Sequence, residues 1–205
     1  MMLTMTTEAP MLLAQIRDGD DTAIGRLLAG YQKYLTLLAR VQIGRRLQGK
    51  VDANDIVQEV FLEAHRQMPQ FRGTTEAELL AWLRRILAGQ IAQTMRRFLG
   101  TKGRDVRLEQ ELAGQIDHSS QALDGGLVAG QSTPSQRASR REQAVLLADA
   151  LEKLPPDYRE VIILRNLEGL AFADVAARMG KTLDSVQKLW VRALASLRRS
   201  MGGGK

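Results

Sequence analysis

Apolar residues recur along most of this chain at intervals of three and four positions, the spacing that places them on one face of an α-helix. The longest such stripe runs through residues 76–99 and consists of Leu80, Leu83, Leu87, Ile91, Met95 and Phe98. Comparable patterns predict helices over residues 11–17, 22–47, 53–68, 141–153 and 157–170, after a loose tail over residues 1–10. The sequence contains no run of alternating β-branched residues, the pattern that is typical of a strand. We therefore expect an all-α fold.

Two short helical patterns meet at Gly180 near the end of the chain. The first covers residues 172–179 and ends where Gly180 can adopt the left-handed conformation that terminates a helix. The hydroxyl of Thr182 can cap the second helix, whose inward positions are Val186, Trp190, Ala193 and Leu197. Two helices joined by a tight glycine turn predict a helix-turn-helix.

The outward positions of the second helix carry amide and basic side chains. They are Gln187, Lys188, Val191 and Arg192, with Ser185 in the first turn. Such groups read base edges and phosphates when a helix lies in the major groove of DNA. A helical hairpin that only packs against the rest of the protein is the alternative explanation of the same pattern.

Acidic residues line one side of the predicted helix over residues 53–68. Asp55, Glu59 and Glu63 fall at positions i, i+4 and i+8, with Asp52 and Gln58 nearby. A solvated face with acids near the helix N-terminus accounts for Asp52 and Asp55 but less well for Glu63. A docking surface for a basic partner accounts for all of them, so both interpretations stay open.

The helix over residues 76–99 carries a second pattern opposite its apolar stripe. Trp82, Arg85, Gln93 and Arg96 project to that side, after a loop over residues 71–75. Bases stack on aromatic rings and phosphates pair with guanidinium groups, so this face suits single-stranded nucleic acid. A half-buried tryptophan among solvated arginines is the alternative.

Helical periodicity disappears between residues 100 and 140, where Gly, Ser and Gln accumulate around Pro134. This composition predicts a flexible linker with a transient helix at Leu108–Ala113. We therefore expect two helical domains, residues 1–100 and 141–205, joined by a linker over residues 101–140.

The composition narrows the class of protein. A formal charge of +6 and an isoelectric point near 10.0 indicate an anionic partner, although ribosomal and membrane-surface proteins share this property.

The chain has no cysteine, and its two histidines, His65 and His118, have no neighbours at ligand spacing, so we expect no metal or other cofactor. It has no nucleophile–base pair that would indicate an enzyme. No apolar run approaches the ~20 residues that span a bilayer and no signal peptide is evident, so we expect a cytoplasmic protein without membrane insertion.

With these motifs in view, the chain resembles the extracytoplasmic-function (ECF) sigma factors of bacterial RNA polymerase. Three segments carry the resemblance in the order typical of that family: residues 52–65, 71–97 and 154–194. They are similar to the helix that binds the polymerase clamp, the segment that melts and reads the minus-ten element, and the domain that reads the minus-thirty-five element. The resemblance implies a non-enzymatic transcription initiation factor.

The resemblance also implies roles for residues already singled out. Asp52, Asp55, Gln58 and Glu59 would contact the β′ clamp of core polymerase. The loop residues Arg72, Gly73, Thr74 and Thr75 would hold a flipped base, with Arg85, Gln93, Arg96 and Arg97 along the adjoining strand. Ser185, Gln187, Lys188, Val191 and Arg192 would contact duplex promoter DNA. An apolar surface around Val161–Leu167 would lie near the β flap, and an anti-sigma factor is a further candidate partner.

This chain departs from the family pattern at a few positions. Ala171 stands where a Ser or Thr cap is common, and Gln187 and Leu189 replace basic residues common in relatives. Two other functions fit part of the pattern. A stand-alone helix-turn-helix regulator would leave the acidic residues unexplained, and a polymerase-binding adaptor would bind the enzyme without opening promoters.

Overall fold

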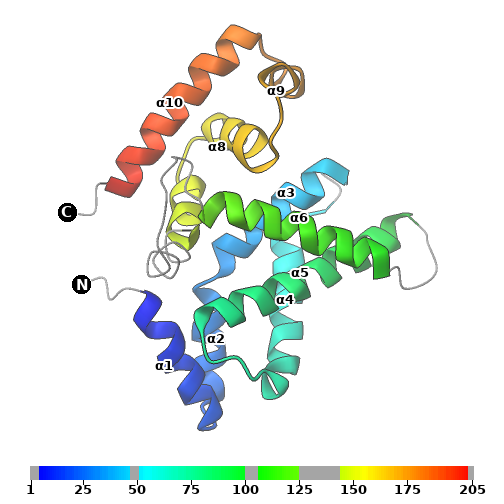
Figure 1. The fold of residues 1–205 in the computed structure, drawn as a ribbon, viewed down its shortest axis with the longest axis vertical. Helices are drawn as coiled ribbons and strands as arrows, with labels where there is room; N and C mark the ends of the chain where they lie inside the picture. Colours follow the sequence, from blue (N-terminus) through cyan, green and yellow to red (C-terminus); the bar gives the residue numbers. More distant parts are fainter. Residues whose placement is uncertain (1–4, 47–50, 100–105, 125–143, 203–205) are drawn as a thin grey trace.

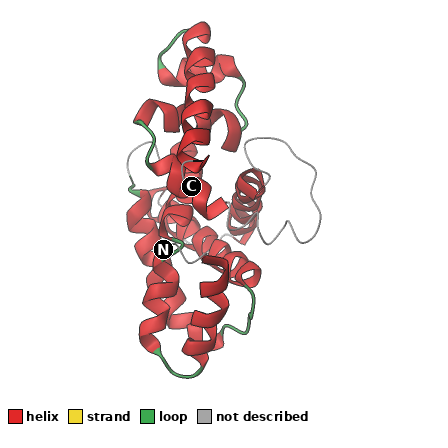
Figure 2. Cartoon of the chain, turned by 90° about the vertical axis from the view of Figure 1, so that its left-hand side faces the viewer, coloured by secondary structure: helices red, strands yellow, loops and turns green. Residues whose placement is uncertain are grey.

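The computed structural model describes residues 5–46, 51–99, 106–124 and 144–202. Every regular element in these ranges is helical, which confirms the all-α prediction (Figures 1 and 2). The first half contains α1 (Met5–Arg17), α2 (Asp21–Ala29), α3 (Gln32–Arg46), α4 (Ala53–Gln67), the short η1 (Met68–Gln70), α5 (Glu76–Leu99) and α6 (Val106–Asp124). The second half contains helical residues 144–152, α8 (Pro156–Ile162), the π-helical turn η2 (Ile163–Leu167), α9 (Phe172–Met179) and α10 (Leu183–Gly202).

The first half is built around α3, which packs against α4, α5 and α6. Tyr34, Leu35 and Leu38 of α3 are completely or almost completely buried. The apolar stripe of α5 packs against α3 and α4, although Phe98, predicted to belong to the stripe, is 53% exposed. The bounds of α5 agree with the predicted helix over residues 76–99.

The expected helix over residues 22–47 is interrupted at Gly30 and Tyr31: α2 ends with Gly30 as its C-cap, and α3 begins at Gln32. The Tyr31 side chain is buried. The Tyr31 hydroxyl donates a hydrogen bond to Glu76 Oε1 over 2.9 Å. Burial raises the pKa of Tyr31, so the hydroxyl keeps the proton that it donates. The predicted tail was also too long, since α1 already begins at Met5.

Part of the predicted linker is a helix of the first half. The 19 residues of α6 pack against α3 and α5 and bury Leu112, Ile116 and Leu123. The hydroxyls of Tyr34 and Ser120 lie 2.9 Å apart in this buried contact. The predicted transient helix at Leu108–Ala113 was therefore too short. The apolar positions of α6 are widely spaced among glycine, glutamine and serine residues, so the sequence gives only a weak helical pattern. The remaining linker residues, 101–105 and 125–140, lie outside the described ranges.

The second half contains the predicted helix-turn-helix, formed by α9 and α10. Its support comes from α8 and η2, whose apolar side chains are turned inward. The side chains of Val161, Ile162, Ile163, Leu164 and Leu167 are all at most 6% exposed. The prediction of an apolar surface around Val161–Leu167 is therefore wrong for this arrangement of the chain, because the apolar side chains of this segment lie in the core.

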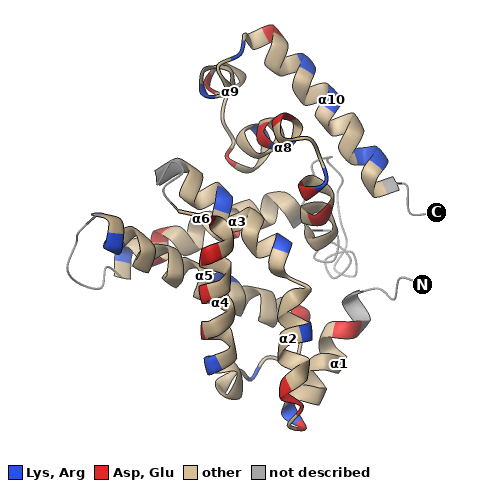
Figure 3. Ribbon diagram, turned by 180° about the vertical axis from the view of Figure 1, so that it is seen from behind, with Lys and Arg blue, Asp and Glu red and all other residues tan. Residues whose placement is uncertain are grey.

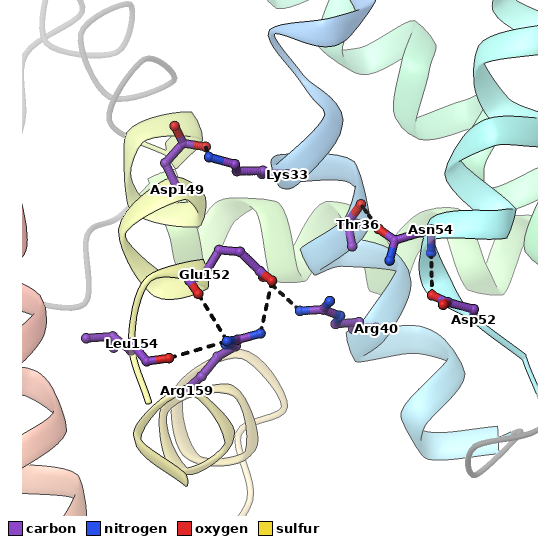
Figure 4. Close-up of polar contacts among 9 residues, drawn as sticks. All are labelled: Lys33, Thr36, Arg40, Asp52, Asn54, Asp149, Glu152, Leu154 and Arg159. Carbon is purple, nitrogen blue, oxygen red and sulfur yellow. Dashed lines mark hydrogen bonds and ion pairs between the residues drawn. The ribbon is translucent and has the colours of Figure 1, made fainter. Parts of the chain in front are cut away.

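The two halves meet through ion pairs between α3 and the start of the second half (Figure 4). Arg40 Nη1 of α3 lies 2.8 Å from Glu152 Oε2. Within the second half, Arg159 Nη1 lies 3.1 Å from the other oxygen of the same carboxylate. Lys33 Nζ lies 3.4 Å from Asp149 Oδ1 beside them. The pairs of Arg40 and Lys33 join the two halves of the chain. Both pairs are partly exposed, so each contributes about 1 kcal/mol or less to stability and mainly fixes the orientation of the halves.

A buried amide in α3 gives a test of this packing. Gln42 is 1% exposed, and neither Nε2 nor Oε1 has a hydrogen-bond partner in the described part of the chain. An unsatisfied buried polar group costs about 1–3 kcal/mol. We expect Gln42→Met, which preserves the length of the side chain, to raise the free energy of unfolding in urea by about 1–2 kcal/mol.

Thr36→Val is the control for this substitution. Thr36 lies in the same helix, but its Oγ1 donates to Asn54 Oδ1 over 3.3 Å. Removing a satisfied hydroxyl should lower the free energy of unfolding by about 0.5–1.5 kcal/mol. A decrease for Gln42→Met as well would contradict the description of Gln42 as an unsatisfied group.

Candidate protein- and nucleic-acid-binding surfaces

Three carboxylates and an amide form an exposed surface on α4, named here the acidic face of α4: Asp52, Asp55, Gln58 and Glu59 (Figure 3). The helix begins where Asp52 Oδ1 accepts a hydrogen bond from the Asn54 N–H over 2.8 Å. Ile56, Val57 and Val60 anchor the opposite side in the core. The rigid helix therefore presents the acidic face to solvent.

Glu63 does not belong to this exposed surface. Its side chain is half-buried and accepts hydrogen bonds from Arg66 Nη1 and Gln67 Nε2, both over 2.6 Å. These partners give Glu63 a local structural role, so the acidic face ends one helical turn earlier than the sequence pattern indicated.

The loop that precedes α5 is held by a reciprocal pair of hydrogen bonds, a capping box. The Thr75 Oγ1 accepts from the Glu78 N–H over 3.3 Å. One oxygen of Glu78 accepts from the Thr74 N–H at 2.8 Å, the Thr75 hydroxyl at 2.9 Å and the Thr75 N–H at 3.0 Å. The bonds from Thr74 and then Thr75 hold the pKa of Glu78 below its ordinary value.

Gly73 is required in this loop because its neighbours leave no room for a side chain. A Cβ atom at Gly73 would lie 2.3 Å from Cζ of Phe71 and 2.9 Å from Cβ of Glu78. The Phe71 ring in turn packs on Trp82, with ring centroids 4.7 Å apart. The loop is therefore fixed against α5, while Arg72, Thr74 and Thr75 stay exposed.

Beyond this ring pair lies a groove of about 570 Å³ between α4, α5 and α6, named here the α5 groove. Its lining contains the predicted Trp82, Arg85, Gln93 and Arg96. The remaining lining residues are Glu63, Gln67, Ile86, Gly89, Gln90 and Glu109. The structure thus brings three predicted nucleic-acid contacts together beside an aromatic ring, whereas Arg97 is exposed outside the lining.

Some of these lining residues were missed from the sequence. Gln90 lies five positions after Arg85 and three before Gln93, so helical periodicity alone could have placed it on this face. Glu109 could not have been placed, because α6 was not predicted in full. Its Oε1 lies 3.3 Å from Arg96 Nη1.

The helix-turn-helix positions α10 by polar and aromatic contacts around its turn. Gly180 adopts the left-handed conformation with φ of 62°, and Thr182 Oγ1 accepts from the Ser185 N–H over 3.3 Å, as predicted. Trp190 Nε1 donates to Asn166 Oδ1 over 2.9 Å, and its ring meets Phe172 edge-on with centroids 5.4 Å apart. Val186, Ala193 and Leu197 complete the buried side.

The residue before α9 offers no side-chain cap, as Ala171 predicted. Arg165 strengthens this end of the helix instead. Its guanidinium lies 4.7 Å from the centre of the Phe172 ring and donates to the Leu170 carbonyl over 2.9 Å. A cation over an aromatic ring is favourable, so the start of α9 is held without a Ser or Thr cap.

Five side chains make up the outer face of α10: Ser185, Gln187, Lys188, Val191 and Arg192. All five are exposed. Lys188 Nζ pairs with Asp184 Oδ2 over 2.8 Å within the helix. Because both partners are largely exposed, this pair is weak and leaves Lys188 available to a stronger anionic partner.

Other kinds of site are absent from residues 5–46, 51–99, 106–124 and 144–202 in two respects. Those ranges contain no group of three or more His, Cys, Asp or Glu side chains that could hold a metal ion. Among the described helices, none combines the length and apolar character needed to cross a bilayer.

Both halves of this chain are similar to known proteins. A family model described as Sigma-70 region 2 matches residues 31–98, and one described as Sigma-70, region 4 matches residues 144–197. The ECF RNA polymerase sigma-E factors of Haemophilus influenzae and Escherichia coli K12 are each 29% identical to this chain. The alignments cover 89% of this chain in both cases, and 89% and 88% of the two relatives. A solved structure of CnrH in complex with the cytosolic domain of CnrY aligns with 97% of this chain and 99% of its own, at 24% identity and a TM-score of 0.37.

The lowered pKa of Glu78 predicts how the capping box responds to acid. Ionised Glu78 stabilises the folded state above the unfolded pKa near 4.5, and this contribution is lost as the pH falls through the lower folded pKa. We expect wild type to have a higher Tm than Glu78→Gln at about pH 7, and the difference to vanish at about pH 2.

Glu59→Gln is the matched control, since it removes an exposed glutamate of α4 that has no capping role. Its Tm should follow that of wild type across the pH range. A difference between wild type and Glu78→Gln that is independent of pH would contradict a stabilising role for the carboxylate charge.

Proposed function

We propose a division of labour for this chain, which belongs to the ECF subfamily of the bacterial sigma-70 factors and is an RNA polymerase sigma factor for transcription initiation. The observation that carries it is the order of the two regions along one chain. Region 2 covers α3, α4 and α5, and region 4 covers the helix-turn-helix, so the matches together cover more than half of the residues. The acidic face of α4 and the loop before α5 lie within region 2, and the outer face of α10 lies within region 4. The α5 groove lies within region 2 except for Glu109 of α6.

The acidic face of α4 is the proposed contact with core polymerase, at the β′ clamp. Asp52, Asp55 and Glu59 present carboxylates from one rigid helix, and Gln58 adds a neutral hydrogen-bonding group among them. Such a surface complements a basic partner, accelerates the encounter and disfavours acidic competitors. This assignment gives a role to the exposed carboxylates of Asp55 and Glu59, and a second role to Asp52, which also caps the helix.

The loop before α5 and the α5 groove are the proposed site for unpaired promoter DNA. Arg72, Gly73, Thr74 and Thr75 form a rigid edge that can receive a flipped base. Arg85, Gln93 and Arg96 then follow the strand along the groove, with Arg97 beyond it. Guanidinium groups bind phosphates and an adjacent ring offers a stacking surface, which together suit a single strand.

The outer face of α10 is the proposed reader of duplex DNA. Its first turn carries Ser185 and Gln187, and Lys188, Val191 and Arg192 follow along the same exposed side. In helix-turn-helix proteins the second helix lies in the major groove with these positions toward the bases and phosphates. Phosphate contacts would set affinity, and the few base contacts would set specificity.

We extend the proposal to the organisation of the whole chain. Residues 1–100 and 141–205 act as two binding units without catalytic activity, in the cytoplasm where polymerase works. The second unit also faces the β flap, although the buried side chains of residues 161–167 are not the contact in the arrangement described here. An anti-sigma factor is a further partner consistent with the family.

Charge reversal tests the assignment of α4. Asp55→Lys with Glu59→Lys should weaken binding of the full chain to core polymerase about tenfold or more, because like charges would then face one another. Glu111→Lys with Asp174→Lys is the control, since both residues are exposed, lie outside α4 and produce the same change in net charge. Equal affinity of both double variants for core polymerase, measured by fluorescence titration, would remove the assignment.

Arg192→Ala tests the separation of the two functions. The variant should retain wild-type affinity for core polymerase but lose about 1–3 kcal/mol of affinity for promoter duplex as holoenzyme. Arg26→Ala, which removes the same charge from α2, is the control. A loss of core binding by Arg192→Ala would refute the proposed separation.

Arg85→Ala tests the α5 groove. We expect weaker binding of the full chain to a fluorescein-labelled single-stranded oligonucleotide, with a slope of log affinity against log salt about 0.7 smaller in magnitude. Arg26→Ala removes the same charge from α2, which contributes nothing to the lining of the groove. Equal slopes for the two variants would show that the groove does not bind phosphates.

A further inference from the structure

The α5 groove contains an acidic group where its proposed ligand carries negative charge. Glu109 of α6 lies 3.3 Å from Arg96, and the two side chains are only 22% and 19% exposed. The other acid of the lining, Glu63, is hydrogen-bonded to Arg66 and Gln67 on its own helix. Glu109 is thus the carboxylate that α6 adds to the arginines of the groove.

Glu109 is held there by a helix with anchors of its own. Leu112, Ile116 and Leu123 are buried against α3 and α5. Asp117 Oδ1 lies 2.7 Å from Arg84 Nε, which forms a second ion pair between α6 and α5. These contacts do not depend on the pair between Glu109 and Arg96, so α6 can keep its place when that pair is broken.

α6 also lies outside both matched regions, in the stretch between residues 98 and 144. Glu109 therefore reaches the groove from outside the segment that matches region 2. A carboxylate and a phosphate offer a guanidinium the same kind of anionic oxygen acceptor. Arg96 Nη1 is the donor that faces Glu109 Oε1, so a phosphate that takes this N–H group must replace the carboxylate.

We propose that Glu109 is an intramolecular competitor that occupies Arg96 until single-stranded DNA displaces it. The proposal rests on the assignment of the α5 groove to unpaired promoter DNA. A strand that enters the groove must separate Glu109 from Arg96 and then tolerate the carboxylate nearby. The competition lowers the affinity of the groove for DNA that has not been brought to it by the polymerase and the duplex contacts.

Glu109→Gln tests this competition, because it removes the charge and preserves the size of the side chain. We expect the full-length variant to bind a fluorescein-labelled single-stranded oligonucleotide about three- to tenfold more tightly than wild type, measured by fluorescence anisotropy. Glu111→Gln, two positions away on an exposed part of α6 outside the groove lining, should change the affinity much less. Circular dichroism should show the same helix content for all variants.

The effect must also depend on Arg96. In an Arg96→Gln background, Glu109→Gln should raise the affinity clearly less than it does in the wild-type background, because no guanidinium remains to be released and only the repulsion between carboxylate and DNA is removed. An undiminished gain in that background would overturn the proposal and show that Glu109 repels DNA without competing for Arg96. Weaker or equal binding by Glu109→Gln alone would also overturn it.

The Arg85→Ala variant separates this inference from the function of the groove. If Arg85→Ala lowers the affinity for the oligonucleotide and Glu109→Gln fails to raise it, the groove binds DNA and only the competition is refuted. If neither substitution changes the affinity, both the groove assignment and the competition are refuted.

Discussion

The burial of α3 on several sides is the constraint on which the structure depends. Tyr34, Leu35, Leu38 and Val41 are removed from water, and α4, α5 and α6 each cover part of the helix. The side of α3 that carries Lys33 and Arg40 is turned instead to the second half of the chain. A helix enclosed in this way tolerates few polar groups, which is why the buried amide of Gln42 stands out.

Because α3 provides so much of the buried surface, the helices around it need only one side for packing. The acidic face of α4 and the groove side of α5 are the parts of these helices left over for partners. α10 also uses only one side for packing: Val186, Ala193 and Leu197 are buried, whereas Arg192 is exposed on the opposite side. A substitution on an outward side can thus change binding and leave the fold intact, which makes charge and alanine variants informative.

Elements with local signals could be predicted from the sequence, and those that depend on distant partners could not. The bounds of α5 and the turn at Gly180 followed from a regular apolar stripe and from a glycine that adopts positive φ. The break near Tyr31 was missed because the apolar stripe continues through it, although Gly30, which caps the end of α2, is a poor helix former. On the groove side of α5, Trp82, Arg85, Gln93 and Arg96 were predicted, whereas Gln90 was missed. The acidic partner Glu109 required the packing of α6, whose apolar residues are too few and too far apart to indicate a stable helix.

On a single helical framework the chain carries the acidic face of α4, which we propose for the transcription machinery, and the α5 groove and the outer face of α10, which we propose for promoter DNA. Run-off transcription with purified core polymerase and a library of randomised promoter fragments tests that claim most directly. The account predicts transcripts that require this chain and start from fragments sharing two short sequence elements at a fixed spacing. Transcripts identical to those of core polymerase alone, from a chain shown to bind the polymerase, would contradict it.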